Sequence, residues 1–221
     1  GPGEEEVKEK IRAVVQAAKL KKALTELKLT SIGHTPQGFG FGRAMDTDMM
    51  KYFGVTLDSI EARELINKAK AYTDEECQEY LEKAKASMKG LDQISENNVK
   101  DFARLYKAYS TYVTENHVGA VSSRCWPDFF TDFGTPVCAV LAMLNDAGVV
   151  ASCESDTYGA LSMYMGTYLT GKPVFFGDPV SMDEKENTVT YWHCGTAACS
   201  LARDPEGAEV GLHCNRHIGP T

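Results

Sequence analysis

The sequence lacks what several large classes of protein need. No apolar run approaches the ~20 residues that span a bilayer, and none of the seven cysteines forms a C-x-x-C pair. Positive charge is scarce, with 23 Lys and Arg against 31 Asp and Glu and a formal net charge of −8. That balance argues against nucleic acid or an anionic membrane as a main partner. The odd cysteine count in 221 residues indicates reduced thiols and a cytoplasmic location.

Nucleotide-binding and zinc-binding patterns are missing too. Gly38, Gly40 and Gly42 do not fit G-x-G-x-x-G, and no Gly-Lys-Ser/Thr follows them, so a phosphate-cradling loop is disfavoured. A tight turn beside a ligand is the milder interpretation. Cys194 and Cys199 are five residues apart, a spacing that fits no closed structural zinc site.

The chain does have a repeated alternation of short apolar segments and helical ones. Residues 4–27 have helical periodicity and follow a Gly-Pro-Gly start that looks like a protease-cleavage scar. Five strand-like apolar segments come next, at residues 28–33, 55–60, 118–122, 149–153 and 173–177. The long stretch 61–116 between the second and third is helical by composition. Past Asp178 the pattern changes, and residues 188–192 and 208–212 look like antiparallel strands that begin a new unit.

This order predicts an α/β domain over residues 28–180. We expect a doubly wound, mainly parallel five-stranded sheet of the flavodoxin or Rossmann-like kind, with a long helical insertion. Residues 1–27 form an N-terminal helix, and residues 181–221 form a short β-rich extension. In such sheets ligands bind beyond the carboxyl ends of the strands. The segments HTPQGFGFGR, SRCWPDFF, CESD and GDPV follow those ends, so we expect a functional site among them.

Two acidic residues stand out in the stretch 149–178. Glu154 follows one predicted strand and Asp178 follows the next, 24 positions later (178 − 154). Since parallel strands end at the same edge, the two carboxylates are expected to lie close together, as a divalent metal site or a general acid/base pair requires. The alternative is that either acid merely caps a helix, with Asp156 as a rival cap for the helix after Glu154.

Three further residues are candidates for the same edge. His193 ends an alternating segment and could complete a metal site, or be a hydrogen-bonded structural residue. Arg124 could anchor an anionic or polyhydroxyl ligand. Trp126 could stack on a sugar face, or belong to a small apolar cluster with Cys125 and the two phenylalanines that follow.

The segments RCWPDF, LNDAGVVASCESDTYGALSMYMGTYLTGKPVFFGD and WHCG resemble the fucose isomerase-like branch of the L-fucose/L-arabinose isomerase family. The stretch HTPQGFGFGRAMDTDMMKYFGV looks like the start of that family's second domain. The resemblance covers about residues 28–200. Its members are aldose–ketose isomerases that use a divalent metal, usually manganese, and they are oligomers.

The resemblance implies roles for particular residues. Glu154 and Asp178 are its metal-binding carboxylates, which also move a proton through an enediol intermediate. His193 matches a position that lines the site and is a further metal ligand. Arg124 and Trp126 would contact the sugar substrate. By the same resemblance the chain would be a homo-oligomer.

The chain is shorter than full members of that family. It is expected to be a central domain with the start of a C-terminal domain, an incomplete metal site and little activity in isolation. The alternatives are a sugar or polyol-binding domain without catalysis, and an oligomerisation module that uses the helices of 61–116. A flavin-binding domain of the flavodoxin kind is the least favoured alternative.

Overall fold

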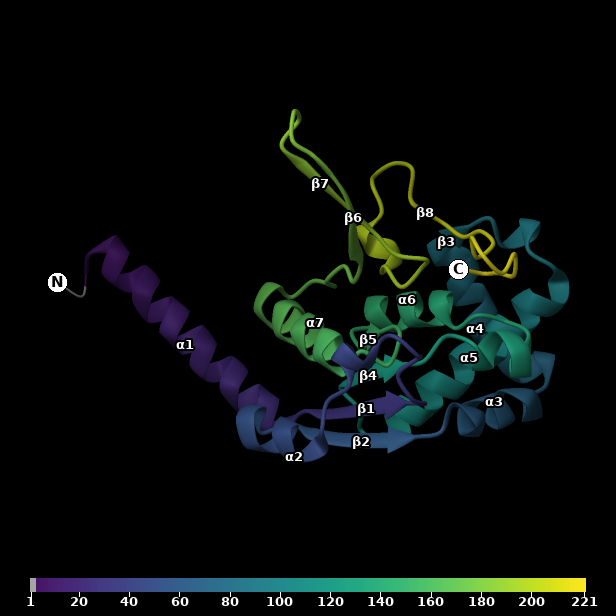
Figure 1. The fold of residues 1–221 in the computed structure, drawn as a ribbon, viewed down its shortest axis with the longest axis horizontal. Coiled ribbons are helices and arrows are strands. Elements are labelled where there is room, and N and C mark those ends of the chain that lie inside the picture. The colour runs from purple at the N-terminus through teal and green to yellow at the C-terminus, as the bar shows by residue number, and fades with distance from the viewer. Residues whose placement is uncertain (1–2) are drawn as a thin grey trace.

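The computed structural model describes residues 3–221, and its centre is a parallel sheet. The strand order is β2-β1-β4-β5, and every pairing within it is parallel (Figure 1). These four strands are β1 (Lys28–Ile32), β2 (Thr56–Ile60), β4 (Ala120–Ser123) and β5 (Val150–Ser152). The predicted α/β class is therefore confirmed, with four strands in the sheet in place of five.

Helices cover both faces of the sheet because side chains alternate along each strand. Val121 and Ala151 face one hydrophobic core, whereas their neighbours Ala120 and Val150 face the other. The first core packs the sheet against α3 (Ala62–Ala71), α5 (Glu96–Glu115) and α6 (Cys138–Asp146). The second packs it against α7 (Thr157–Thr170) and the end of α1 (Glu5–Glu26). Short helical turns complete the connections after β1: η1 (Gly40–Gly42), α2 (Asp46–Asp48) and η2 (Met49–Phe53).

The long helical insertion is present as predicted. It consists of α3, α4 (Asp74–Ser87) and α5. Capping boxes begin α3 at Glu61 and α4 at Thr73, and Ser95 accepts a hydrogen bond at the start of α5. The insertion also holds β3 (Met88–Lys89) and η3 (Leu91–Gln93). Because α5 carries Phe102 and Tyr109 into the first core, each fully buried, the insertion is part of the domain's main core.

Two elements project from this body. The helix α1 extends away from the sheet at the left of the view, and a hairpin rises at the top of the view (Figure 1). The hairpin is β6 (Asp178–Asp183) paired antiparallel with β7 (Thr188–Trp192), and all its residues are exposed. After η5 (Cys199–Leu201) the short strand β8 (Ala208–Glu209) pairs parallel with β3, not antiparallel as its pattern suggested. Within residues 3–221, no helix combines the length and the apolar character needed to cross a membrane.

The predicted fifth strand at residues 173–177 is wrong. The segment is irregular, and α7 ends before it at the left-handed Gly171. Its apolar residues pack on α7: Val174 and Phe176 lie over Gly166 and Gly159, where a Cβ atom would come within 2.8 and 2.6 Å of them. The apolar run that predicted a strand is therefore explained by contact with two glycines of α7. As a consequence Asp178 starts the hairpin and does not end a strand of the parallel sheet.

Candidate functional site

The corner between β5 and α7 presents Glu154 in an unusual backbone conformation. Glu154 and Ser155 have φ angles of 56° and 50°, in the left-handed region that non-glycine residues rarely adopt. The helix begins only afterwards, with the Asp156 side chain accepting a hydrogen bond of 2.7 Å from the Gly159 N–H. Asp156 is thus the cap of α7, and the capping alternative for Glu154 is excluded. Strained backbone that the fold holds in place is concentrated at functional sites.

Hydrogen bonds fix this corner to the neighbouring strands. The Ser155 hydroxyl donates to the Ile32 carbonyl at 3.2 Å, and the Ser155 N–H donates to the Ser123 carbonyl at 3.1 Å. The Ser152 hydroxyl donates to the Asp156 carbonyl at 2.7 Å. These bonds join the ends of β1, β4 and β5, and they hold the backbone on both sides of Glu154. Burial raises the pKa of Asp156, and the charge of Glu154 adds to that rise.

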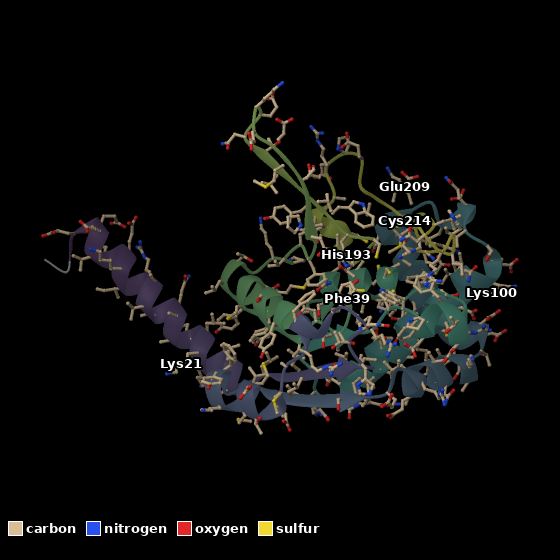
Figure 2. All side chains as sticks on the ribbon, viewed as in Figure 1. Lys21, Phe39, Lys100, His193, Glu209 and Cys214 are labelled. Carbon is tan, nitrogen blue, oxygen red and sulfur yellow. The ribbon has the colours of Figure 1, made fainter. Side chains whose placement is uncertain are left out.

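His193, which directly follows β7 of the hairpin, contacts Glu154. The Glu154 Oε2 and His193 Nε2 atoms are 3.3 Å apart, and the two side chains are only 12% and 4% exposed. Figure 2 shows His193 at the base of the hairpin, just after β7. Phe176 packs against its ring with centroids 5.3 Å apart. Burial opposes protonation, but hydrogen bonds to Cys194 and Glu154 outweigh it and raise the pKa of His193 to about 10.

Several thiols lie behind this pair. Cys153 is fully buried, and its Sγ lies with a Glu154 oxygen and a His193 nitrogen in a group whose atoms are all within 4.8 Å of one another. The Cys125 and Cys138 sulfurs are 3.4 Å apart. Hydrogen bonding to Cys125, together with burial, raises the pKa of Cys153 well above its usual value. A hydrogen bond from Cys138 and the nearby His193 lower the pKa of Cys194 to about 4.

Asp178 is not part of this group among the residues described. Asp178 is exposed and pairs with Trp192 at the open end of the hairpin. Trp192 is the residue directly before His193. Its charge still reaches the site, since it contributes to the raised pKa of Asp156. Glu154 and Asp178 therefore lie in the same region, but Glu154 is held by the core and Asp178 lies on the projecting hairpin.

Arg124 and Trp126 lie in the loop after β4, at the same end of the sheet. The Arg124 Nε is 2.5 Å from an Asp128 oxygen and donates to the Trp126 carbonyl at 3.2 Å. Trp126 meets Phe39 edge to face, with centroids 6.2 Å apart. The structure thus engages Arg124 within its own loop, and the contact with Phe39 joins the glycine-rich loop to the loop after β4.

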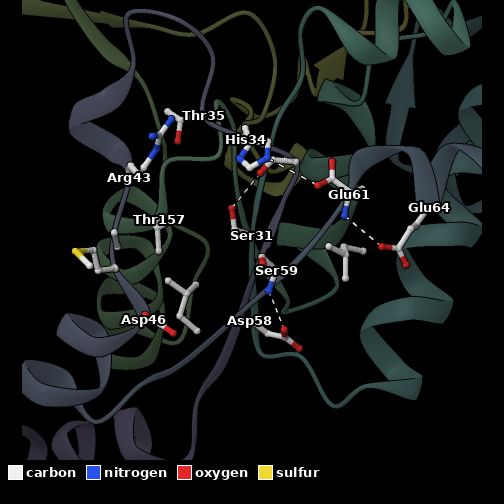
Figure 3. A pocket seen from close by; sticks show the side chains of 15 residues that line it. Ser31, His34, Thr35, Arg43, Asp46, Asp58, Ser59, Glu61, Glu64 and Thr157 are labelled. Carbon is white, nitrogen blue, oxygen red and sulfur yellow. Dashed lines mark hydrogen bonds and ion pairs between the residues drawn. The ribbon is translucent and has the colours of Figure 1, made fainter.

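A cavity of about 550 Å³ opens at the carboxyl ends of β1 and β2. Figure 3 shows Thr35 and Arg43 on one side, Glu61 and Glu64 on the other, and His34 between them facing Glu61. Thr157, near the start of α7, also lines it. This volume suits a monosaccharide, and its lining of hydroxyl, carboxylate and basic groups suits a polyol.

A divalent cation fits the Glu154–His193 pair by donor chemistry. A carboxylate oxygen and an imidazole nitrogen that face each other inside the protein are common ligands of such ions. The sequence predicted both residues from their positions, but not Ser155 or Cys153. No sequence signal indicates the left-handed turn at Glu154 and Ser155, because Glu and Ser are not typical of that conformation.

No protein-family model matches the chain. The relatives found in a comparison of sequences belong to one class by name, the sugar isomerases. In particular, the chain is 61% identical over 220 residues to a sulfoquinovose isomerase of Clostridium sp. (strain MSTE9). It is 35% identical over 219 residues to one from Priestia aryabhattai and 33% identical over 221 residues to one from Alkalicoccus urumqiensis.

These matches cover 99–100% of this chain. They cover only 49–50% of each relative, so the chain spans about half the length of the curated relatives it matches. The chain is thus similar along nearly its whole length to proteins named sulfoquinovose isomerase, and it aligns with about half of each.

Proposed function

We propose that this chain carries the proton-transfer part of an aldose–ketose isomerase of the L-fucose/L-arabinose isomerase-like group, and that its sugar is sulfoquinovose. The observation that carries the proposal is the buried Glu154–His193 pair on the strained corner after β5. Support for the substrate comes from the relatives, each a sulfoquinovose isomerase by name.

Isomerisation of an aldose to a ketose moves one proton between neighbouring carbons. A base removes the proton from C2 while the carbonyl oxygen on C1 gains one, which gives an enediol. A proton is then delivered to C1 while the hydroxyl on C2 loses its proton to give the ketone. Glu154 is the proposed base, because a carboxylate can accept a proton from carbon and the bonded corner holds it in place. Asp178, at the start of β6, is the proposed second carboxylate and lies close enough to influence Asp156.

Glu154, Asp178 and His193 are the proposed ligands of a divalent cation, manganese by family resemblance. When bound, such an ion polarises the carbonyl and the adjacent hydroxyl of the sugar. Phe176 packs on the His193 ring and keeps water from that side. Arg124 and Trp126 are proposed to contact the sugar from the loop after β4, and Arg43 and His34 from the cavity wall.

Proton exchange at the sugar carbon tests this function more directly than full turnover. The chain is incubated with sulfoquinovose and Mn²⁺ in D₂O, and deuterium at C2 is followed by NMR. We expect measurable incorporation with the wild type and a loss of at least about 10²-fold with Glu154→Gln, since a positioned general base contributes that much or more. Lys51→Gln, an exposed change on the short turn η2, is the matched control.

The same experiment separates catalysis from simple sugar binding. A binding domain without chemistry gives no exchange at C2, and that outcome contradicts the proposal. Exchange that is equal in the wild type and in Glu154→Gln contradicts the assignment of the base. Glucose offered in place of sulfoquinovose shows whether the sulfonate is needed.

A further inference from the structure

The loop after β1 brings a cation to the cavity at the carboxyl ends of β1 and β2. Arg43 directly follows η1 and lines this cavity, whose volume is about 550 Å³. Within residues 3–221, its guanidinium has no hydrogen bond and no ion pair. Figure 3 shows Arg43 beside Thr35, on the side of the cavity opposite Glu61 and Glu64. A guanidinium without a partner in the protein is available to an anionic group of a ligand.

Two other basic residues near this cavity already have acidic partners. The Arg124 Nε atom is 2.5 Å from an Asp128 oxygen. The His34 Nε2 atom lies 3.8 Å from a Glu61 oxygen. Of the two basic residues that line the cavity, His34 and Arg43, only Arg43 has no such partner in the described part of the chain. An anion that enters the cavity is therefore attracted to the side on which Arg43 lies.

Close packing of the backbone holds Arg43 near the corner after β5. Gly42 is buried, and a Cβ atom at this position would come within 3.0 Å of the backbone and side chain of Asp156. Glycine permits this approach, which a side chain would hinder. Asp156 is two residues after Glu154, and Thr157 lines the same cavity as Arg43. The glycine-rich loop, which matches no phosphate-binding motif, thus places a cation beside the corner that presents the proposed base.

The proposed substrate has an anionic group that matches this cation. Sulfoquinovose carries a sulfonate on C6, at the opposite end of the sugar chain from C1 and C2, between which the proton moves. A sulfonate keeps its negative charge over the whole pH range in which the protein is folded, and its oxygens suit the N–H fork of an arginine. With C1 and C2 at Glu154, the carboxylates of Glu61 and Glu64 repel the sulfonate and Arg43 attracts it. The charges of the cavity therefore orient C6 toward Arg43.

We infer that Arg43 binds the sulfonate group of the sugar and so makes the site select sulfoquinovose over sugars that lack this group. The inference rests on the proposed function, which supplies the sugar and the position of its reacting carbons. It assigns the glycine-rich loop the task of presenting Arg43, and it separates recognition of C6 from the proton transfer at Glu154.

Binding of two matched sugars tests the inference without turnover. The 221-residue chain with ¹⁵N-labelled arginine and Mn²⁺ is titrated with sulfoquinovose and with 6-deoxyglucose, which has a hydrogen in place of the sulfonate. We expect the Arg43 Nε–H signal, assigned by its loss in Arg43→Gln, to shift with sulfoquinovose and not with 6-deoxyglucose. Sulfoquinovose is expected to bind the wild type at least about tenfold more tightly, and Arg43→Gln to remove most of that preference. Arg43→Lys keeps the charge without the fork and is expected to retain part of the preference.

Arg63→Gln is the matched control and is expected to keep the preference. Arg63 is an exposed arginine of α3 that also has no ion pair within the described residues, and it lines a neighbouring cavity that does not include Thr157. A preference that survives in Arg43→Gln overturns the inference, as does a wild type that binds the two sugars equally or binds neither. Deuterium exchange at C2 distinguishes the two proposals. Exchange without a preference for sulfoquinovose overturns the role of Arg43 alone, whereas a preference that depends on Arg43 without exchange overturns the proposed catalysis alone.

Discussion

The corner after β5 and the hairpin β6–β7 each supply residues to one candidate site, but they are built in opposite ways. The corner is buried, has two left-handed residues, and is bonded to β1 and β4. The hairpin is exposed along its whole length and presents Val180, Met182 and Tyr191 to solvent. Glu154 belongs to the first region and Asp178 to the second.

This difference teaches that the geometry of one carboxylate is fixed by the domain itself, whereas that of the other is not. The neighbouring Ser155 is bonded to the ends of β1 and β4, which holds the backbone of Glu154 in place. Asp178 is held by one antiparallel pair and a turn. We therefore expect changes around the corner to cost stability and changes in the hairpin to cost little, and the following predictions test that contrast.

The largest effect is expected from a core substitution beneath the corner. Leu141 of α6 is fully buried in the first core, so Leu141→Ala is expected to lower the free energy of unfolding by about 3 kcal/mol. Met182→Ala, at a hairpin residue that is 77% exposed, is expected to change it by less than about 0.5 kcal/mol. Urea unfolding followed by circular dichroism measures both. Equal losses would show that the hairpin is as much part of the folded core as α6.

The next effect concerns the Glu154–His193 pair and depends on pH. The pKa of His193 is raised from 6.5 to about 10, so the protonated pair stabilises the fold fully below pH 6.5 and loses that stabilisation as the pH rises to about 10. In metal-free protein at pH 6, we expect the free energy of unfolding of the wild type to exceed that of Glu154→Gln by about 2 kcal/mol. The difference should shrink toward zero near pH 10.

Comparing the two proteins at each pH removes contributions that both share, such as that of Cys194. Glu6→Gln breaks the exposed 2.7 Å contact with Lys10 on α1 and serves as the control that should show no such trend. A difference between wild type and Glu154→Gln that stays constant from pH 6 to pH 10 would contradict the charged pair.

The smallest effect compares two aspartates that accept backbone hydrogen bonds in the two regions. Asp156 caps α7, so Asp156→Ala is expected to cost about 1 kcal/mol, and Asp156→Asn should recover most of it. Asp183 accepts from the Lys185 and Glu186 N–H groups in the hairpin turn. Asp183→Ala is expected to cost less than about 0.5 kcal/mol. Thermal unfolding distinguishes the two, and a reversed order would mean that the hairpin turn is the more constrained.

Much of the architecture was predictable because local patterns report burial. The apolar runs that became β1, β2, β4 and β5 are bounded by turn residues, and the helices of 61–116 carry their own caps. Position in the sequence alone predicted that Glu154 lies at the carboxyl edge of the sheet, since an acid that follows a buried strand lies at the ligand-binding edge of a parallel sheet. The resemblance of the segments around it to sugar isomerases agrees with the relatives found.

Tertiary structure decided the rest, because two different surroundings can produce the same local pattern. Residues 173–177 form an apolar run like that of a strand, yet Val174 and Phe176 are apolar because they pack on two glycines of α7. That placed Asp178 on a hairpin and brought Phe176 against His193. The sequence by itself determined the order of helices and parallel strands and the acid that follows β5. Only packing between distant segments determined that His193 meets Glu154, since a contact across 39 residues has no local signature.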